Sequence, residues 1–410
     1  MATQVVSRRR CPACGGNGGG SLVANIALRT PDHHPLGSGY QVACCFACGC
    51  GFANIPDQTS YYERYYASLA KYANEALIER LSQKSGRPDS DLEPAWVSGK
   101  ADSSARRILD LTPRLNSRVL DVGCSTGSLL AALGRLGYSE LHGVDPSAES
   151  VYRANARAGV NAEVGTFSSI PAGIGTFDLI CVTGVFEHLW DVDAAMKALL
   201  PLLRADGVIY VEVPDARRYL DPYISPYEDF STEHINHFSS TCLRWLASRF
   251  GLKTISEVSC EVPLFEEVLT SCVAVAWTRA SSLKNLEQRD NDLERELIAF
   301  AEKSLNDLTV VSKKLELALS ASSEYILWGI GDSALKLLAL PVLSSRQVEL
   351  FVDGNPSRWG FRFDGAPVVA PSSISSGRTP IIAGSFIRAD SIVEAASRLG
   401  LLNPIIRIDL

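Results

Sequence analysis

The sequence of 410 residues has little that would suit a membrane or secreted protein. No stretch is long and apolar enough to cross a membrane, and residues 1–10 have no apolar segment of the kind found in secretory signals. The chain also has no excess of positive charge, because the net charge is −7, and no basic run follows Arg8–Arg10. We therefore expect a cytoplasmic protein that binds neither nucleic acid nor membrane, while the oligomeric state stays open.

Cysteine is unevenly distributed. Six of the 11 cysteines fall within residues 11–50, and four of them form two Cys-x-x-Cys pairs. Two such pairs supply the four thiolates of a structural zinc site, with no position left for a reacting molecule. The predicted ligands are Cys11, Cys14, Cys45 and Cys48, with Cys44 and Cys50 as rivals for the second pair. A redox role is less favoured, because no strand–helix–strand pattern surrounds either pair.

Residues 119–128, Val-Leu-Asp-Val-Gly-Cys-Ser-Thr-Gly-Ser, predict a buried strand, a glycine turn and a helix. The turn carries Asp121, Gly123, Ser125 and Gly127. A dinucleotide fingerprint would read Gly-x-Gly-x-x-Gly, whereas here an acidic residue precedes the glycines and would repel a pyrophosphate. It suits a ligand with an ammonium group. The pattern resembles the first motif of class I S-adenosylmethionine-dependent methyltransferases.

The resemblance implies further donor-binding residues. Asp145 lies 24 positions after Asp121, at the end of the next predicted strand, where a carboxylate can accept both ribose hydroxyls. Phe167 follows the third strand and is expected to line the adenine pocket. Glu187 follows the fourth strand and is assigned to the same site. S-adenosyl-L-methionine is thus the predicted methyl donor.

Strand patterns alternate with helical ones from about residue 100 to 278, which predicts an α/β fold with a mostly parallel, doubly wound sheet. The expected domains are a zinc-binding arm (1–55), a helical, tyrosine-rich lid (56–100), the methyltransferase core (101–280), a linker helix (281–322) and a C-terminal Rossmann-like substrate domain (323–410). Tyrosines of the lid could either pack on the arm or meet the ligands.

The C-terminal domain carries a second glycine turn, in residues 326–334, with Asp353 placed 24 residues after Gly329. This Gly-x-Gly-x-x-Ala pattern is typical of nucleotide-binding turns but is weak alone. Substrate binding, a structural duplicate of the core and a nicotinamide site are all compatible with it.

Two acidic–histidine pairs are the catalytic candidates. Glu187-His188 follows a predicted strand, and Glu233-His234 follows a loop rich in proline and tyrosine. Histidine is the natural proton acceptor near neutral pH, and a neighbouring carboxylate can orient it.

The order of these features, with Tyr65 and Tyr66 in the lid, is similar to that of the sugar C-methyltransferase family. The resemblance implies that His234 is the base, Glu233 its partner and His188 the group that stabilises a keto oxygen, in C-methylation of a nucleotide-linked ketosugar. The family pattern Tyr-His-Glu-His-x-x-Tyr-Phe-Ser is not complete, since Ser231, Thr232 and His237 occupy three of its positions.

Two alternatives remain open. One is O- or N-methylation of another sugar or secondary metabolite, and the other is a non-catalytic, nucleotide-binding assembly protein. A small molecule is the expected partner of the C-methyltransferase and of the O- or N-methyltransferase.

Overall fold

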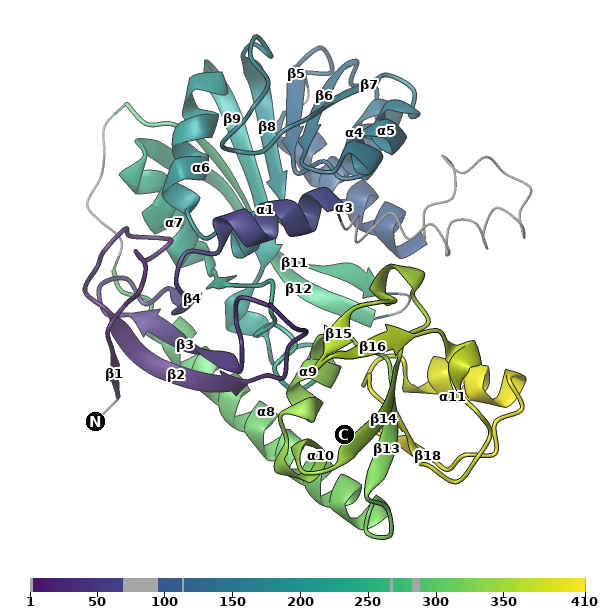
Figure 1. Cartoon of the computed structure of the whole chain (residues 1–410). Helices are drawn as coiled ribbons and strands as arrows, with labels where there is room; N and C mark the ends of the chain where they lie inside the picture. The colour runs from purple at the N-terminus through teal and green to yellow at the C-terminus, as the bar shows by residue number, and fades with distance from the viewer. Residues whose placement is uncertain (1–2, 69–94, 113, 266–267, 282–287, 410) are drawn as a thin grey trace. The chain divides into compact units, whose positions relative to one another are not determined.

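The computed structural model in Figure 1 describes residues 3–68, 95–112, 114–265, 268–281 and 288–409. The chain forms two compact units. The first contains Met1–Ser21, Ala43–Pro222 and Glu233–Glu296, and the second contains Leu22–Val42, Tyr223–Thr232 and Leu297–Leu410. No helix within these described ranges has both the length and the apolar character that a membrane span requires.

The first unit is built on a seven-stranded sheet of order β11-β12-β9-β8-β5-β6-β7. Its strands are β5 (Arg118–Val122), β6 (Glu140–Asp145), β7 (Val160–Val164), β8 (Phe177–Thr183), β9 (Leu203–Pro214), β11 (Leu252–Phe265) and β12 (Val268–Arg279). Neighbouring strands from β7 to β9 are parallel, and β12 is antiparallel to both of its neighbours. This is the predicted mostly parallel α/β sheet.

Helices accompany this sheet: α3 (Ala95–Leu111), α4 (Ser128–Arg135), α5 (Ala148–Asn155), α6 (Val192–Leu199) and α7 (Ser240–Arg249). Ile108, Leu130 and Val151 of the first three pack in one core with Val119 of β5. Leu120 points to the opposite face of the sheet and is also fully buried. Both faces are therefore covered, which explains why consecutive residues of a central strand, such as Val119 and Leu120, can both be apolar.

The direction in which strands are added changes between β5 and β8, because β6 and β7 follow on one side and β8 and β9 on the other. Ligands of such sheets bind outside the carboxyl ends of the strands at this point. The predicted donor site lies at these ends, directly after β5, β6, β7 and β8.

A five-stranded sheet has the order β1-β2-β3-β4-β10. It contains β1 (Gln4–Val5), β2 (Gly20–Ala27), β3 (Gly39–Cys45), β4 (Gly51–Ala53) and β10 (Asn236–His237). β10 is antiparallel to β4, with Asn236 opposite Phe52. Helix α1 (Thr59–Ser68) follows β4. The rest of the predicted lid up to residue 94, which includes Tyr72 and an expected loop at 85–88, lies outside the described residues.

The second unit has a six-stranded sheet of order β15-β16-β14-β13-β17-β18, parallel from β16 to β18. Its strands are β13 (Glu324–Trp328), β14 (Gln347–Val352), β15 (Arg362–Phe363), β16 (Ala366–Val369), β17 (Ile381–Ala383) and β18 (Ile405–Arg407). The helices are α9 (Asp332–Leu338), α10 (Pro341–Ser344) and α11 (Ala389–Arg398). Ile326, Val352 and Ile392 share its core.

Helix α8 (Asn291–Ala318) lies within the range predicted as a linker helix. Of its leucines, Leu293, Leu297 and Leu308 are buried whereas Leu305 is exposed. Leu283 and Leu286, the first two leucines of the predicted linker helix, are outside the described part of the chain. Short 3-10 helices complete the structure: η2 (Phe186–His188), η3 (Leu200–Leu202), η4 (Ala216–Arg218), η5 (Pro356–Arg358) and η6 (Pro371–Ser373).

Candidate active site

The glycine turn after β5 is held by the end of β6. Asp145 accepts backbone N–H groups from Ser125 (2.8 Å) and Ser147 (2.9 Å), and Gly123 donates to the carbonyl of Val144 (2.8 Å). Ser147 also caps α5. The residue predicted to bind ribose thus shapes the turn as well, which a sequence pattern does not reveal.

Glycine is needed at two positions of this turn. Gly123 has a φ of 83°, and a Cβ there would lie 2.6 Å from Cγ2 of Val185. Gly127 has a φ of 77°, and its Cβ would lie 3.0 Å from the Cβ of Ala154. Backbone at these points therefore comes closer to its neighbours than a side chain would allow, as a ligand-binding turn requires.

Asp121, at the end of β5, is almost completely buried, with 2% of its surface exposed. Its Oδ1 has no hydrogen-bond partner in the part of the chain that the structure describes. Burial, with a contribution from the charge of Asp145, raises the pKa of Asp121 to about 7. A buried carboxylate with an unused oxygen fits a cationic partner such as the ammonium group of a bound amino acid.

Phe167 lies in the segment after β7, the last strand of the sheet on this side, and is half-buried. The next residue, Ser168, donates a hydrogen bond to Glu63 of α1 (3.1 Å). The tyrosine-bearing helix therefore contacts the loop that was predicted to line the adenine pocket.

The two acidic–histidine pairs, 46 residues apart in sequence, lie side by side. The rings of His188 and His234 have centroids 4.9 Å apart. Nδ1 of His188 is 3.1 Å from the carbonyl oxygen of Glu233, and the N–H of Ile235 donates to the carbonyl of Glu187 (2.8 Å). All four predicted residues are thus brought to the carboxyl end of β8.

Tyrosines from α1 complete this group. Tyr65 donates to Oε1 of Glu233 (3.3 Å), and Tyr66 donates to Oε2 (3.2 Å). The hydroxyl of Tyr66 is also 3.2 Å from Nδ1 of His188. Both hydroxyls therefore contact predicted catalytic residues, while contact of the lid with a bound ligand stays a prediction.

Glu187 lies deepest in the group, with 3% of its surface exposed. Burial raises its pKa, and the proximity of His188 opposes this shift. One nitrogen of His188, one of His234 and a carboxylate oxygen of Glu187 all lie within 4.8 Å of one another. Glu187 therefore belongs to the histidine group, and its role in donor binding stays a prediction.

Sequence reasoning missed one acidic residue beside this group. Glu212, near the end of β9, is 1% exposed and accepts hydrogen bonds from Arg107 (2.8 Å), Ser104 and Tyr210. Burial acts to raise its pKa, but the charges of Lys100 and Arg107 hold it below its usual value. The only sequence signal was one acid inside the apolar run Val211-Glu212-Val213.

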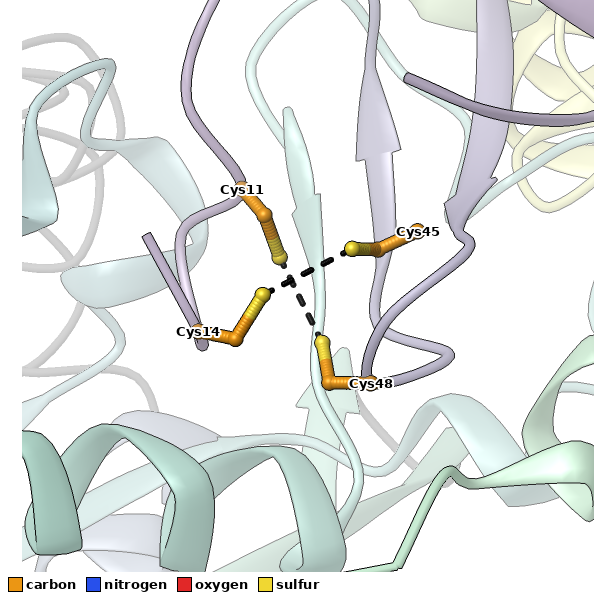
Figure 2. Close-up of side chains that lie close together, drawn as sticks. All are labelled: Cys11, Cys14, Cys45 and Cys48. Atoms are coloured by element: carbon orange, nitrogen blue, oxygen red, sulfur yellow. Dashed lines mark hydrogen bonds between the residues drawn. The ribbon is translucent and has the colours of Figure 1, made fainter. Parts of the chain in front are cut away.

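The four predicted zinc ligands converge on one point (Figure 2). Sγ of Cys11 is 3.5 Å from Sγ of Cys48, and Sγ of Cys14 is 3.6 Å from Sγ of Cys45. All four sulfurs lie within 4.8 Å of one another. Four sulfurs at a zinc–sulfur distance of about 2.3 Å would be separated by about 3.8 Å, so the cluster fits this metal.

Neither rival cysteine belongs to this group of four. Cys50 is hydrogen-bonded to the carbonyls of Gly51 (3.6 Å) and His237 (3.7 Å), and Cys44 is completely buried outside the group of four.

In the second unit, the predicted nucleotide-binding turn is engaged with its own chain. Asp353 accepts N–H groups from Ile330 (2.8 Å) and Asn355 (2.8 Å) and contacts Arg358 (3.2 Å). A Cβ on Gly331 would lie 3.6 Å from Nη1 of Arg358. The guanidinium therefore sits at the glycine turn.

Comparison with known proteins adds an independent result. Residues 66–257 match a family model described as a methyltransferase domain. A ubiquinone biosynthesis O-methyltransferase of Rhizobium johnstonii is 30% identical over 123 residues, which cover 28% of this chain and 49% of that protein. A probable S-adenosylmethionine-dependent methyltransferase of Mycobacterium tuberculosis is 26% identical over 161 residues, 38% of this chain and 56% of that protein.

The chain thus spans about half the length of the curated relatives it matches. Among solved structures, magnesium protoporphyrin IX methyltransferase of Synechocystis PCC 6803 with bound SAH is 15% identical, with a TM-score of 0.39, over 54% of this chain and 100% of that one.

Proposed function

We propose that this chain, whose central part is a class I S-adenosylmethionine-dependent methyltransferase domain, methylates a small molecule after a histidine removes a proton from it. The observation that carries this proposal is the convergence of Glu187-His188 and Glu233-His234 at the carboxyl end of β8, beside the donor edge. A proton acceptor placed next to a methyl-donor site has the elements that methylation of a weakly acidic group requires.

Residues of the chain would hold S-adenosylmethionine at the ends of the strands. The set is Asp121, Gly123, Ser125, Gly127, Asp145, Phe167 and Glu187. When bound, the donor supplies a methyl group on a sulfonium, which needs no further activation. The protein's part is to pair Asp121 with the ammonium group, to accept the ribose hydroxyls at Asp145 and to exclude water.

His234 takes the proton of the acceptor, which leaves the acceptor as the nucleophile. Glu233 orients the site through its contacts with Tyr65 and Tyr66 and would stabilise the imidazolium that forms. His188 donates to the oxygen on which negative charge develops. The proton is returned to water from His234 after the product leaves.

A nucleotide-linked ketosugar is the acceptor that we favour. Support comes from the order of features along the chain: the paired cysteines, the tyrosine helix and the Glu-His segment. In this proposal the C-terminal, Rossmann-like domain recognises the nucleotide. Because Arg358 and the backbone engage Asp353, this turn suits a substrate-recognition or structural role better than a dinucleotide.

O-methylation of another small molecule is the second candidate. It is favoured by the names of curated relatives, which are ubiquinone biosynthesis O-methyltransferases. A histidine base serves either reaction, since a hydroxyl also loses its proton when its oxygen is methylated.

We further propose that Cys11, Cys14, Cys45 and Cys48 bind one structural zinc ion. Their sulfur separations support this assignment. With four thiolates and no open position, the ion would stabilise the arm without taking part in the reaction.

Deuterium exchange separates these reactions. Chain saturated with S-adenosylhomocysteine is incubated in D₂O with a panel of nucleotide-linked ketosugars. C-methylation predicts that the carbon next to the keto group gains deuterium, that His234→Ala abolishes this gain, and that calorimetry still detects donor binding by the variant. No exchange with any ketosugar, combined with methylation of a hydroxyl compound, would favour the second candidate. Failure to bind S-adenosylmethionine would refute both.

A further inference from the structure

The histidine pair is held in place by the N-terminal arm. Asn236, two residues after His234, donates from Nδ2 to the carbonyls of Phe186 (2.7 Å) and Leu189 (2.7 Å). These two carbonyls flank Glu187-His188. One side-chain amide therefore bridges both ends of the short helix that carries a candidate pair.

Arg9 holds this amide from the other side. Its Nη2 donates to Oδ1 of Asn236 (2.5 Å), and it is 5% exposed. Arg9 precedes Cys11 by two residues, and its guanidinium lies 5.9 Å from the ring centroid of Trp190. Because Asn236 accepts from an arginine through its oxygen, its nitrogen must face the two carbonyls.

The backbone forms a second connection. Ala53, the last residue of β4, donates to the carbonyl of Ile235 (2.8 Å), and Ile235 donates to the carbonyl of Glu187 (2.8 Å). The residue directly after His234 is thus fixed between the arm and η2. β4 itself begins three residues after Cys48.

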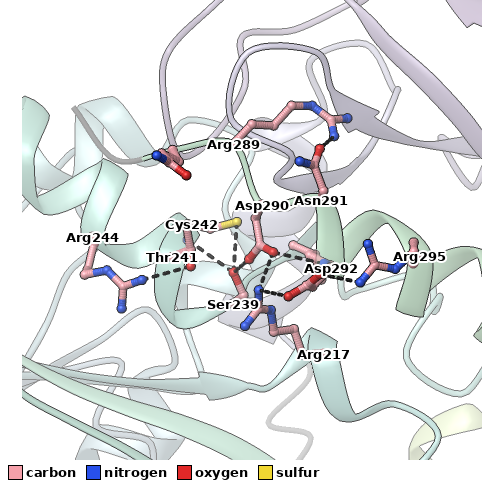
Figure 3. A network of polar contacts seen from close by, with 12 residues as sticks. Arg217, Ser239, Thr241, Cys242, Arg244, Arg289, Asp290, Asn291, Asp292 and Arg295 are labelled. Carbon is pink, nitrogen blue, oxygen red and sulfur yellow. Dashed lines mark hydrogen bonds and ion pairs between the residues drawn. The ribbon is translucent and has the colours of Figure 1, made fainter.

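A third connection starts at Cys48 and passes through Asp290 and Ser239, whose contact Figure 3 shows. Its carbonyl accepts the N–H of Asp290 (2.9 Å), and Oδ2 of Asp290 accepts from Ser239 (2.6 Å). Ser239 caps α7 immediately after the 233–238 segment. Gly49 packs tightly here, because a Cβ on it would lie 2.4 Å from the carbonyl oxygen of Asp290.

Electrostatics links Arg9 to the cysteine cluster. A metal ion bound by four thiolates carries net negative charge, and such a site attracts a buried guanidinium nearby. Without ordered thiolates, Arg9 would lose this electrostatic partner, and its contact with Asn236 would be less firmly held.

We propose that Asn236 and Arg9 are positioning residues through which the cysteine cluster sets the geometry of the Glu187-His188 and Glu233-His234 pairs. This inference rests on the proposed zinc site and on the proposed role of the histidines. It extends both, because it makes an ion that touches no substrate a requirement for the alignment of the catalytic group.

Hydrogen–deuterium exchange on the full chain tests the proposal. We compare metal-loaded wild type, the same protein after chelation, and metal-loaded Asn236→Ala. Chelation should raise exchange of the amides of His188, Leu189 and Ile235 at least tenfold. Asn236→Ala should raise exchange of the amides of His188 and Leu189 at least tenfold as well. In this variant the metal should stay bound, and affinity for S-adenosylmethionine should be unchanged.

Asn54→Ala is the matched control. Asn54 is also buried and fixes the same N-terminal segment, through the N–H of Arg8 (2.7 Å) and the carbonyl of Val6 (3.1 Å), but forms no bond to η2. Exchange at residues 188–189 should stay as in wild type.

Unchanged exchange at these amides, in both chelated wild type and Asn236→Ala, would overturn the proposal. Should Asn236→Ala fail to fold, chelated wild type decides alone. Metal analysis and donor titration of wild type report separately on the zinc assignment and on the proposed function. Once an acceptor is known, Asn236→Ala should lower kcat at least tenfold without changing the KM for S-adenosylmethionine.

Discussion

Asp121 and Asp145 end neighbouring parallel strands, yet only Asp145 has both carboxylate oxygens engaged by backbone N–H groups. Oδ1 of Asp121 finds no such partner among the described residues. The charge of Asp145 adds to burial in raising the pKa of Asp121 to about 7. The carboxylate of Asp145 thus stabilises the chain's own turn, whereas the charge of Asp121 is poorly compensated by hydrogen bonds.

This difference predicts that donor binding depends on pH. If the ionised form of Asp121 pairs with the ammonium group, affinity for S-adenosylmethionine should be about tenfold weaker at pH 6 than at pH 8, by linkage to one proton. Calorimetric titration over this range measures it. Methylthioadenosine, which lacks the amino-acid part, should show no dependence. A wild-type profile as flat as that of Asp121→Asn would remove the assignment.

Gly123→Ala should abolish donor binding. It places a methyl group 2.6 Å from Cγ2 of Val185 and strains a φ of 83°. Gly159→Ala is the control, because Gly159 has a similar φ of 78° but open space around its Cβ position. Both variants should lose about 1–2 kcal/mol of stability from backbone strain, but only the first should lose the donor. Equal donor affinity in the two variants would show that the close approach at Gly123 is unimportant.

Elemental analysis should find one zinc ion per chain. Cys11→Ser and Cys48→Ser should each lose it, because three thiolates and a hydroxyl make a much weaker site. Cys44→Ser should keep the ion, since Cys44 is buried outside the group of four. Metal retained by the first two variants, or lost from the third, would contradict the ligand set.

His237 should make the chain sensitive to acid. It is buried beside Tyr219 (3.1 Å), and burial together with the charge of Arg9 lowers its pKa to about 3. The unfolded chain binds this proton near pH 6.5, so stability falls as the pH drops from 6.5 towards 3, by about 1.4 kcal/mol per pH unit. Urea unfolding of His237→Gln should show a smaller loss over this range. A parallel loss in both proteins would assign the acid sensitivity to other groups.

The same property bears on the family pattern. His237 stands where that pattern has a tyrosine, and a histidine held neutral in the core cannot act as a base that cycles near neutral pH. Its neighbour His234 is only partly buried and faces His188. The two histidines of this segment thus have different environments, which their spacing in the sequence does not indicate.

Local patterns predicted the core of the sheet well. The strand predicted at the start of residues 119–128 is β5 (Arg118–Val122), because its run is short, mostly apolar and followed at once by a glycine turn. The apolar run of β9 starts at Val208, but the strand begins five residues earlier, and its exposed start, Arg204–Asp206, has no apolar pattern that a sequence could reveal. The first residues of this strand are held by pairing with β8, a non-local effect.

The candidate site was only partly predictable. The identities of Glu187, His188, Glu233 and His234 follow from composition and from position after strands. Their assembly depends on β10, a strand of only two residues, and on the amide of Asn236. Such short pairings leave no periodic signal in the sequence.

The pairing of β4 with β10 also has a consequence for the order in which the chain assembles. About 180 residues separate the two strands, so a ribosome would need roughly 10–40 s to make the second after the first. All four cysteines of the cluster emerge early and can capture their ion before that. This edge of β4 stays unpaired until residue 237 has been synthesised, and an unpaired edge can pair with the wrong strand. A pre-formed metal site would hold β4 in the conformation that pairs with β10.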